Sequence, residues 1–193
     1  MNTPKHSGKS EAAERILSTA ATLFYQEGIQ SVGIDRIVKE AGVAMNTMYK
    51  HFPSKDKLIE AYLIRRDENW RSWFTEYIEQ ADTPRERLLA VFDALHAWFQ
   101  TGDFRGCAFI NAVGEFGSEK GEVRRIAYEH KEFIRDYIHG LAREVKISDP
   151  GTFADQLMLL VEGAIVTAHI GNKKESARQA REVASALLAA HGR

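Results

Sequence analysis

The stretch IDRIVKEAGVAMNTMYKHFPSKDKL, Ile34 to Leu58, is the most informative part of the chain. Its first residues carry apolar side chains at every third or fourth position, which is the spacing of one helical face. Gly42 follows, and a glycine there can adopt the left-handed conformation that ends a helix. A second helix, 44–50, ends before Pro53, because proline lacks an N–H and disfavours α geometry in the residue before it. Two short helices joined by such a turn predict a helix-turn-helix, whose second helix fits a DNA major groove.

Part of this stretch also points to a family. Residues Ala41 to Leu58, AGVAMNTMYKHFPSKDKL, resemble the recognition segment of the TetR family of bacterial transcriptional repressors. A predicted helix with an apolar face, 11–27, precedes the segment, as that family requires. Further along, RGCAFINAVGEF, Arg105 to Phe116, resembles the opening of one of the family's C-terminal domain types. The resemblance implies a ligand-responsive transcriptional regulator. Motifs of this kind mostly repress, so we expect a repressor, with an activator as the alternative.

Helical periodicity and capping signals continue to the end of the chain, and no alternating strand pattern interrupts them. We therefore expect an all-α fold of two domains, a helix-turn-helix domain, 1–54, and a larger helical bundle, 55–193. We expect this bundle to bind a ligand, as the resemblance implies, and to form the dimer. The nine expected helices cover 11–27, 34–41, 44–50, 55–80, 84–101, 107–116, 119–146, 150–171 and 175–190.

The candidate DNA-contacting residues lie on the second short helix or just after it: Met45, Asn46, Thr47, Tyr49, Lys50, His51 and Lys55. Asn46 and Thr47 offer amide and hydroxyl groups to base edges or phosphates, and Lys50 can reach a phosphate or a guanine. The resemblance implies phosphate contacts for Tyr49, His51 and Lys55. A buried core aromatic is the alternative for Tyr49.

Three residues depart from the family pattern. Ala44 and Gly33 stand where a hydroxyl residue usually caps the helix that follows, and Met45 replaces a more usual Lys or Arg. A missing cap costs on the order of 1 kcal/mol. These departures favour an alternative reading, a helical interaction protein with lost or altered DNA binding.

The composition describes a folded chain with no broad charge. The 193 residues are 44% hydrophobic and carry a net charge of −1, so any contact with DNA must be local. The single cysteine, Cys107, excludes an internal disulfide and fits a cytoplasmic location, and no signal peptide is evident. The longest apolar run, 157–170, contains Glu162 and His169, and we expect it to be too short and too polar to span a bilayer.

Most of the aromatic residues lie between Tyr62 and Tyr137. They could form the core of a helical bundle, or they could line a cavity for an apolar or aromatic small molecule, and the resemblance favours the cavity. The candidate lining residues are His96, Phe99, Phe109, Asn111, Glu115, Tyr128, Phe133, Met158 and Glu162.

The expected helix 150–171 is apolar around most of its circumference, so it must be covered on all sides. Gly163, Ala164 and Thr167 would allow a second helix to approach closely. We therefore expect a homodimer in which this helix and 175–190 form a four-helix interface about a twofold axis. Such a dimer predicts a near-palindromic operator. The alternative is a buried central helix in a monomer.

An enzyme is not expected, because the chain contains no HExxH, P-loop, GxSxG or GxGxxG motif. We also expect no cofactor. Asp93 with His96, and Asp136 with His139, have the i, i+3 spacing of helical metal ligands, but surface or core histidines are the simpler interpretation. Cys107 could act as a redox sensor if it were exposed beside a cation such as Arg105, whereas a buried thiol would be inert.

Overall fold

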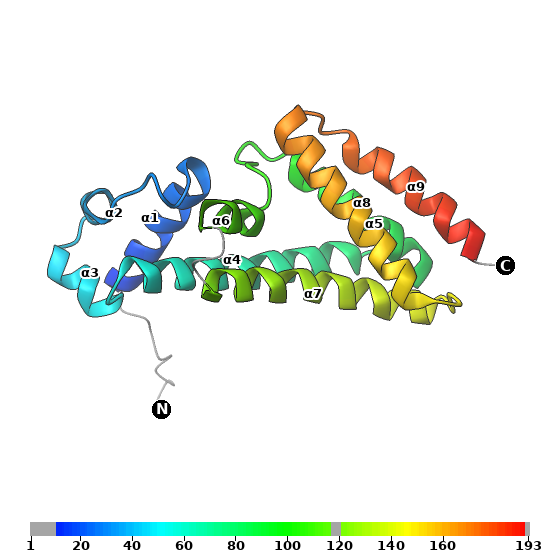
Figure 1. Ribbon diagram of the computed structural model, residues 1–193, viewed down its shortest axis with the longest axis horizontal. Coiled ribbons are helices and arrows are strands. Elements are labelled where there is room, and N and C mark those ends of the chain that lie inside the picture. Colours follow the sequence, from blue (N-terminus) through cyan, green and yellow to red (C-terminus); the bar gives the residue numbers. More distant parts are fainter. Residues whose placement is uncertain (1–10, 117–120, 192–193) are drawn as a thin grey trace, which may run out of the picture.

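A computed structural model describes residues 11–116 and 121–191 (Figure 1). Over these ranges it contains nine helices and no strand, which confirms the predicted all-α fold. The helices are α1 Glu11–Glu27, α2 Ile34–Ala41, α3 Met45–His51, α4 Lys55–Ile78, α5 Pro84–Phe99, α6 Ala108–Phe116, α7 Gly121–Glu144, α8 Pro150–Gly171 and α9 Ser176–His191. Their ends agree closely with the expected ones, and the expected start of the seventh helix, 119–120, lies outside the described residues.

The first three helices gather around the start of α4. Helix α1 packs against α2, α3 and α4, and it buries the apolar face that includes Ile16, Ala20 and Leu23. Gly42 ends α2 in the left-handed conformation, with φ at 63°, and its N–H donates to the carbonyl of Lys39. This turn places α3 at the outer end of the domain (Figure 1).

Side-chain caps mark where three of the longer helices begin. Ser54 Oγ accepts a hydrogen bond from the N–H of Lys57 at 3.2 Å, so α4 starts where the sequence predicts. Thr83 and Glu86 form the expected capping box at α5, and Asp149 caps α8. Each cap satisfies an N–H that the first helical turn leaves without an intrahelical partner.

The remaining helices form a bundle that α4 enters from the N-terminal domain. Helices α4 and α7 run side by side along the molecule, and α5, α8 and α9 pack together at the far end (Figure 1). Helix α6 packs on α7 and lies between α1 and the bundle (Figure 1). Large side chains such as Phe74, Phe92 and Phe153 are fully buried in the core. Because α4 belongs to both parts, a shift of α4 would move the N-terminal domain.

Helix α8 extends beyond the apolar run that the sequence shows. It has 22 residues, and by length and composition alone it is long and apolar enough to cross a membrane. The helix is longer than the apolar run 157–170 because it begins at Pro150, and a core helix of a soluble protein passes the same test. Only 39% of its most apolar window is buried in the monomer, and Leu159 and Ile170 are 75% and 82% exposed. Part of α8 therefore needs a covering surface that this single chain does not provide.

Candidate DNA-binding surface and effector site

Helix α3 presents a polar outer face. Asn46 and Lys50 are exposed, Thr47 is half-buried, and Met48 takes the inward position with no exposed surface. Tyr49 is 47% exposed, so the core alternative for this side chain is wrong. The α-helical period explains this result, because the inward face is already filled by Met48.

The two departures from the family's capping pattern are visible in the structure. Gly33 and Ala44 both adopt the extended conformation of an N-cap, but neither supplies a side-chain hydrogen bond. The first turn of α3 is held instead by backbone bonds, including one from the N–H of Met48 to the carbonyl of Ala44 at 3.2 Å. The missing caps therefore weaken the helix ends without preventing the motif from forming.

Three further candidate DNA residues are only half-exposed: Met45, His51 and Lys55. Lys55 Nζ donates to the carbonyl of Ile29 at 2.7 Å and lies 5.9 Å from the ring of Phe24. Met45 is half-buried against the core, and His51 is also half-buried. In this arrangement the Lys55 ammonium binds the turn after α1. It does not point outward to where a DNA phosphate would lie, as we had expected it to.

The candidate ligand residues do not line one cavity, which corrects the expectation of a single aromatic pocket. Phe99 is fully buried in the core, while Phe133 packs under the guanidinium of Arg71 with 4.4 Å between the charge and the ring centre. His96 faces the loop before α9, where Nδ1 lies 3.3 Å from the carbonyl of Lys174. Met158 is half-buried at the edge of the core. Periodicity found the buried faces, but it could not say which faces meet.

Two neighbouring spaces lie beside α6 and α7. An outer groove of about 650 Å³ is lined by Phe109, Ile110, Val113, Gly121, Arg124, Arg125, Ala127, Tyr128 and Lys131. An inner cavity of about 10 Å³ is lined by Arg66, Trp70, Trp98, Cys107, Ala108, Phe109, His130, Lys131, Ile134 and Ile165. The candidates Phe109 and Tyr128 belong to this region, and Phe109 borders both spaces. A cavity of this size holds about one water molecule.

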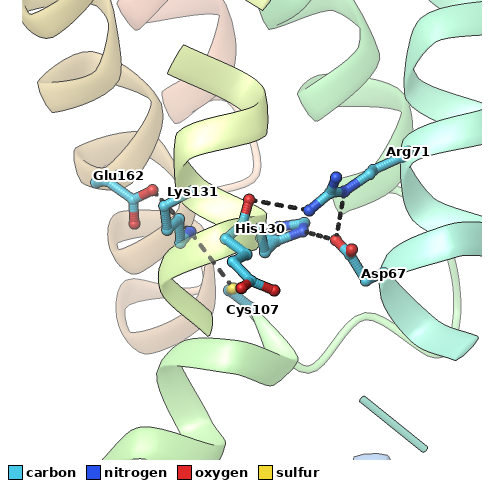
Figure 2. Close-up of polar contacts among 7 residues, drawn as sticks. Asp67, Arg71, Cys107, His130, Lys131 and Glu162 are labelled. Atoms are coloured by element: carbon cyan, nitrogen blue, oxygen red, sulfur yellow. Dashed lines mark hydrogen bonds and ion pairs between the residues drawn. The ribbon is translucent and has the colours of Figure 1, made fainter. Parts of the chain in front are cut away.

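A buried polar network lies behind the inner cavity (Figure 2). His130 Nδ1 and Arg71 Nε contact the same oxygen of Asp67, at 2.6 and 2.8 Å, and Arg71 also donates to the carbonyl of Glu129. Burial lowers the pKa of His130, so we assign a neutral ring that donates from Nδ1. Burial acts to raise the pKa of Asp67, but the hydrogen bonds from His130 and Arg71 outweigh it and lower the pKa.

On the other side of α7, Lys131 reaches toward α8 (Figure 2). Its Nζ lies 2.7 Å from Glu162 Oε1 and 3.5 Å from the sulfur of Cys107. Burial opposes its charge, yet Cys107 and Glu162 raise the pKa of Lys131, so it stays protonated. Cys107 is buried, and its neighbouring cation is Lys131 rather than the expected Arg105, which donates to the carbonyl of Phe104. The candidate ligand residue Glu162 therefore holds Lys131 in place.

Helix α6 is tied directly to the N-terminal domain. Glu115 accepts hydrogen bonds from the N–H groups of Ile29 and Gln30, at 3.0 and 2.6 Å. Tyr25 Oη donates to the carbonyl of Gly106 and accepts from the N–H of Arg105, both at 3.0 Å. Glu115 and Asn111, two candidate ligand residues, also line a separate space of about 350 Å³ between α1 and α6. We call the contacts of Glu115 and Tyr25 the α1–α6 latch.

The suggested metal pairs have other partners. Asp93 pairs with Arg181 at 3.0 Å, and Asp136 lies 3.6 Å from Arg135. Within residues 11–116 and 121–191, no group of three or more His, Cys, Asp or Glu side chains could hold a metal ion.

Two stretches of this chain match known protein families. Residues 16–62 match the family described as bacterial regulatory proteins, tetR family, and residues 84–184 match the tetracyclin repressor-like C-terminal domain. The HTH-type transcriptional regulator YjdC of Escherichia coli is 21% identical over 91% of this chain and 92% of its own length. The crystal structure of SCO4454, a TetR-family regulator from Streptomyces coelicolor, is 32% identical, with a TM-score of 0.90 over 96% of this chain and 92% of that chain. Reduced NemR of E. coli shares the fold at 21% identity, with a TM-score of 0.78 over 90% of this chain and 95% of its own.

Proposed function

Because this chain belongs to the TetR family of bacterial transcriptional regulators, we propose that it is a ligand-responsive repressor that binds a near-palindromic operator as a homodimer. The observation that carries the proposal is the outer face of α3, where Asn46, Tyr49 and Lys50 point away from the core. A face of this kind suits a DNA major groove. The protein would act in the cytoplasm and carry out no catalysis.

Within α3, we assign base contacts to Asn46 and Thr47, and phosphate contacts to Tyr49, Lys50 and His51. Met45 is half-buried and would support the helix more than it contacts DNA. The ammonium of Lys55 is bound to the carbonyl of Ile29, so a phosphate would meet this residue through its backbone at the start of α4.

The dimer would form through α8 and α9. Leu159, Val166 and Ile170 of α8 and Val183 of α9 are exposed apolar side chains, and nothing would meet a Cβ added at Gly163. Exposed apolar side chains that gather on one surface are typical of an interaction surface. A twofold axis there would place two copies of α3 on one side of the dimer, which a near-palindromic operator requires.

The effector would bind in the bundle, and the domains would divide at about residue 54. A ligand that displaces α6 or α7 would strain the α1–α6 latch and shift α4, which changes the spacing of the two recognition helices. It can release the operator only by its preference for the spacing that does not fit DNA. Glu115 supports this route, because one carboxylate joins α6 to two N–H groups of the α1–α2 turn.

A gel-shift assay against the promoter DNA beside the protein's own gene tests the proposal. We expect a specific complex with a Kd of roughly 10⁻⁸ M or below at moderate salt, typical of specific binding. Equal affinity for scrambled DNA of the same length would contradict it, and would favour the alternative in which the uncapped helices α2 and α3 have lost operator recognition.

A further inference from the structure

Trp70, which lines the inner cavity, carries a donor that has no acceptor. Trp70 is 9% exposed, and its Nε1 is buried without a hydrogen-bond partner among the described residues. The ring of His130 meets the indole at 69° with 5.0 Å between centroids, and such a contact is a weaker partner for an N–H than an oxygen acceptor. Native proteins rarely leave a buried donor unsatisfied, so this one calls for an acceptor from outside the chain.

The charged residues that line this cavity are all basic. Arg66 and Lys131 both border it, and no carboxylate does. Lys131 is already paired with Glu162, whereas no ion pair is recorded for Arg66 within the described part of the chain, and its guanidinium lies 3.9 Å above the ring of Tyr25. Arg66 and Trp70 therefore line the same small space, and they also line a neighbouring space of about 350 Å³ that Asp103 borders.

The outer groove supplies the apolar part of a site. Its lining is formed mainly by apolar residues of α6 and α7, including Ile110, Val113 and Tyr128, and among residues 11–116 and 121–191 no carboxylate lines it. Tyr128 is 62% exposed, so this surface is open in the single chain. Lys131 and Phe109 border both the groove and the inner cavity. A molecule in the groove would therefore lie next to the cavity.

Phe109 separates the two spaces. Its ring stacks on His130 with 3.9 Å between centroids and an interplanar angle of 21°. With the ring in this position the inner cavity has only about 10 Å³. Because Phe109 borders both spaces, a displacement of its ring would be required to join the cavity to the groove.

We propose that the effector is a small organic anion, a carboxylate on an apolar body, whose body lies in the outer groove and whose charged end passes Phe109 to reach Arg66 and Trp70. This inference rests on the proposed function, because it names the class of the effector. A carboxylate accepts from both an indole N–H and a guanidinium, and it would offset the positive charge of the cavity. A cation would meet Arg66 and Lys131, and a neutral molecule would leave Arg66 without a counter-charge.

The direct test compares acids with their amides. Cyclohexylacetate, phenylacetate and octanoate would each be titrated against the full chain by calorimetry, beside cyclohexylacetamide, phenylacetamide and octanamide. We expect at least one acid to bind at one site per chain and at least about tenfold more tightly than its amide, which corresponds to about 1.4 kcal/mol. Tryptophan emission should change on binding, because Trp70 and Trp98 line the cavity. Equal binding of every acid and amide, or no binding by any of them, would overturn the proposal.

Two variants connect the preference to this cavity. Arg66→Gln should reduce the ratio of amide Kd to acid Kd to near one, whereas Arg85→Gln, which loses the same charge at the exposed start of α5, should preserve it. Glu162→Gln removes the partner of Lys131 and should raise the affinity for the acid while leaving that for the amide unchanged. A gain of this kind does not arise from misfolding, so it decides the matter even if Arg66→Gln is unstable. An unchanged ratio in both variants would show that the anion binds elsewhere.

The same acids added to the gel-shift assay separate the two proposals. Release of the operator by the preferred acid, and not by its amide, supports both. A carboxylate preference in a protein that binds no operator supports the anion site and contradicts the repressor. Specific DNA binding without any carboxylate preference supports the repressor and contradicts the anion site. Tight acid binding that leaves the DNA complex intact would show that this anion is not the effector.

Discussion

At Gly106 the backbone and a neighbouring side chain both exclude a Cβ. The residue has φ at 76°, and an added Cβ would lie 2.5 Å from His169 Nδ1. Its carbonyl also accepts the hydrogen bond from Tyr25 in the α1–α6 latch. A glycine is therefore needed at the point where the loop before α6 meets both α1 and α8.

We predict that Gly106→Ala lowers the free energy of unfolding by about 2 kcal/mol or more, because a non-glycine residue is strained at this φ and His169 must move. Urea unfolding followed by circular dichroism measures the change. Gly102→Ala in the same loop is the control, because nothing lies within 4 Å of its Cβ position and we expect a change within about 0.5 kcal/mol. Equal effects of the two substitutions would contradict the assignment.

The contact between His130 and Asp67 leads us to predict how the stability of the protein depends on pH. Burial lowers the pKa of His130 in the folded state, so the unfolded chain takes up that proton first as the pH falls through the usual value of 6.5. The unfolded state then binds more protons, and stability falls as the pH drops. Asp67, whose pKa is also lowered, adds to this loss only in the more acidic range where free carboxylates titrate.

We therefore expect the free energy of unfolding to decrease from about pH 7 to about pH 5. His130→Gln keeps a donor for Asp67 but does not titrate, so the decrease should be smaller in this variant. His139→Gln, on the same helix, should retain the decrease of the unchanged protein. Denaturant unfolding at the two pH values gives the slopes, and equal slopes in all three proteins would show that His130 is not responsible.

At the scale of the element, two lysines that looked alike in the sequence have different roles, one on α3 and one at the start of α4. Lys50 lies on the exposed face of α3, whereas Lys55 bonds to the carbonyl of Ile29 and holds the turn between α1 and α2. A lysine that contacts phosphate and a lysine that supports the fold respond differently to salt, so the two roles can be separated by experiment.

Lys50→Ala should weaken operator binding and reduce the slope of log Kd against log salt concentration by about one, as expected when one phosphate contact is lost. Lys55→Ala should leave the slope unchanged and lower the free energy of unfolding by about 1.5–3 kcal/mol, the range for a hydrogen bond to a charged group. Filter binding at several salt concentrations and urea unfolding measure the two quantities. The reverse result would restore the phosphate role that the resemblance implies for the Lys55 side chain.

At the scale of the whole molecule, the exposed face of α8 decides whether two recognition helices can act together. Leu159 is 75% exposed in the single chain, so replacing it should not disturb the monomer's own core. It would, however, place a charge in the interface that we propose between α8 and α9 of two copies. An unpaired charge is costly in such a buried interface.

We predict that Leu159→Glu converts a dimer to a monomer at about micromolar concentration and weakens operator binding by about tenfold or more. Analytical ultracentrifugation gives the mass, and circular dichroism confirms that the chain stays folded. Tyr128→Glu, at a 62% exposed position on α7, is the control and should remain dimeric. If both Leu159→Glu and Tyr128→Glu remained dimeric, the dimer interface would not include the exposed face of α8.

The sequence by itself determined the elements of this protein. Caps at Ser54 and Thr83, the stop at Gly42 and the 3.6-residue period are local signals, and each acts within about one or two turns of its own helix. The family resemblance identified the outer face of α3 for the same reason, because that face lies within one short segment.

Only the tertiary structure decided which faces meet. Lys131 and Glu162 are 31 positions apart, and His130 and Asp67 are 63 apart, and periodicity showed no more than that such residues lie on one side of a helix. The rotation and offset of packed helices determine whether two side chains point at each other, and these depend on how many large residues must interlock at close packing. For this reason the sequence could not place the candidate ligand residues together. Phe99 and Phe133 do not line the outer groove, and the cavity beside Phe109 is lined by Arg66 and Trp70, which the sequence did not single out.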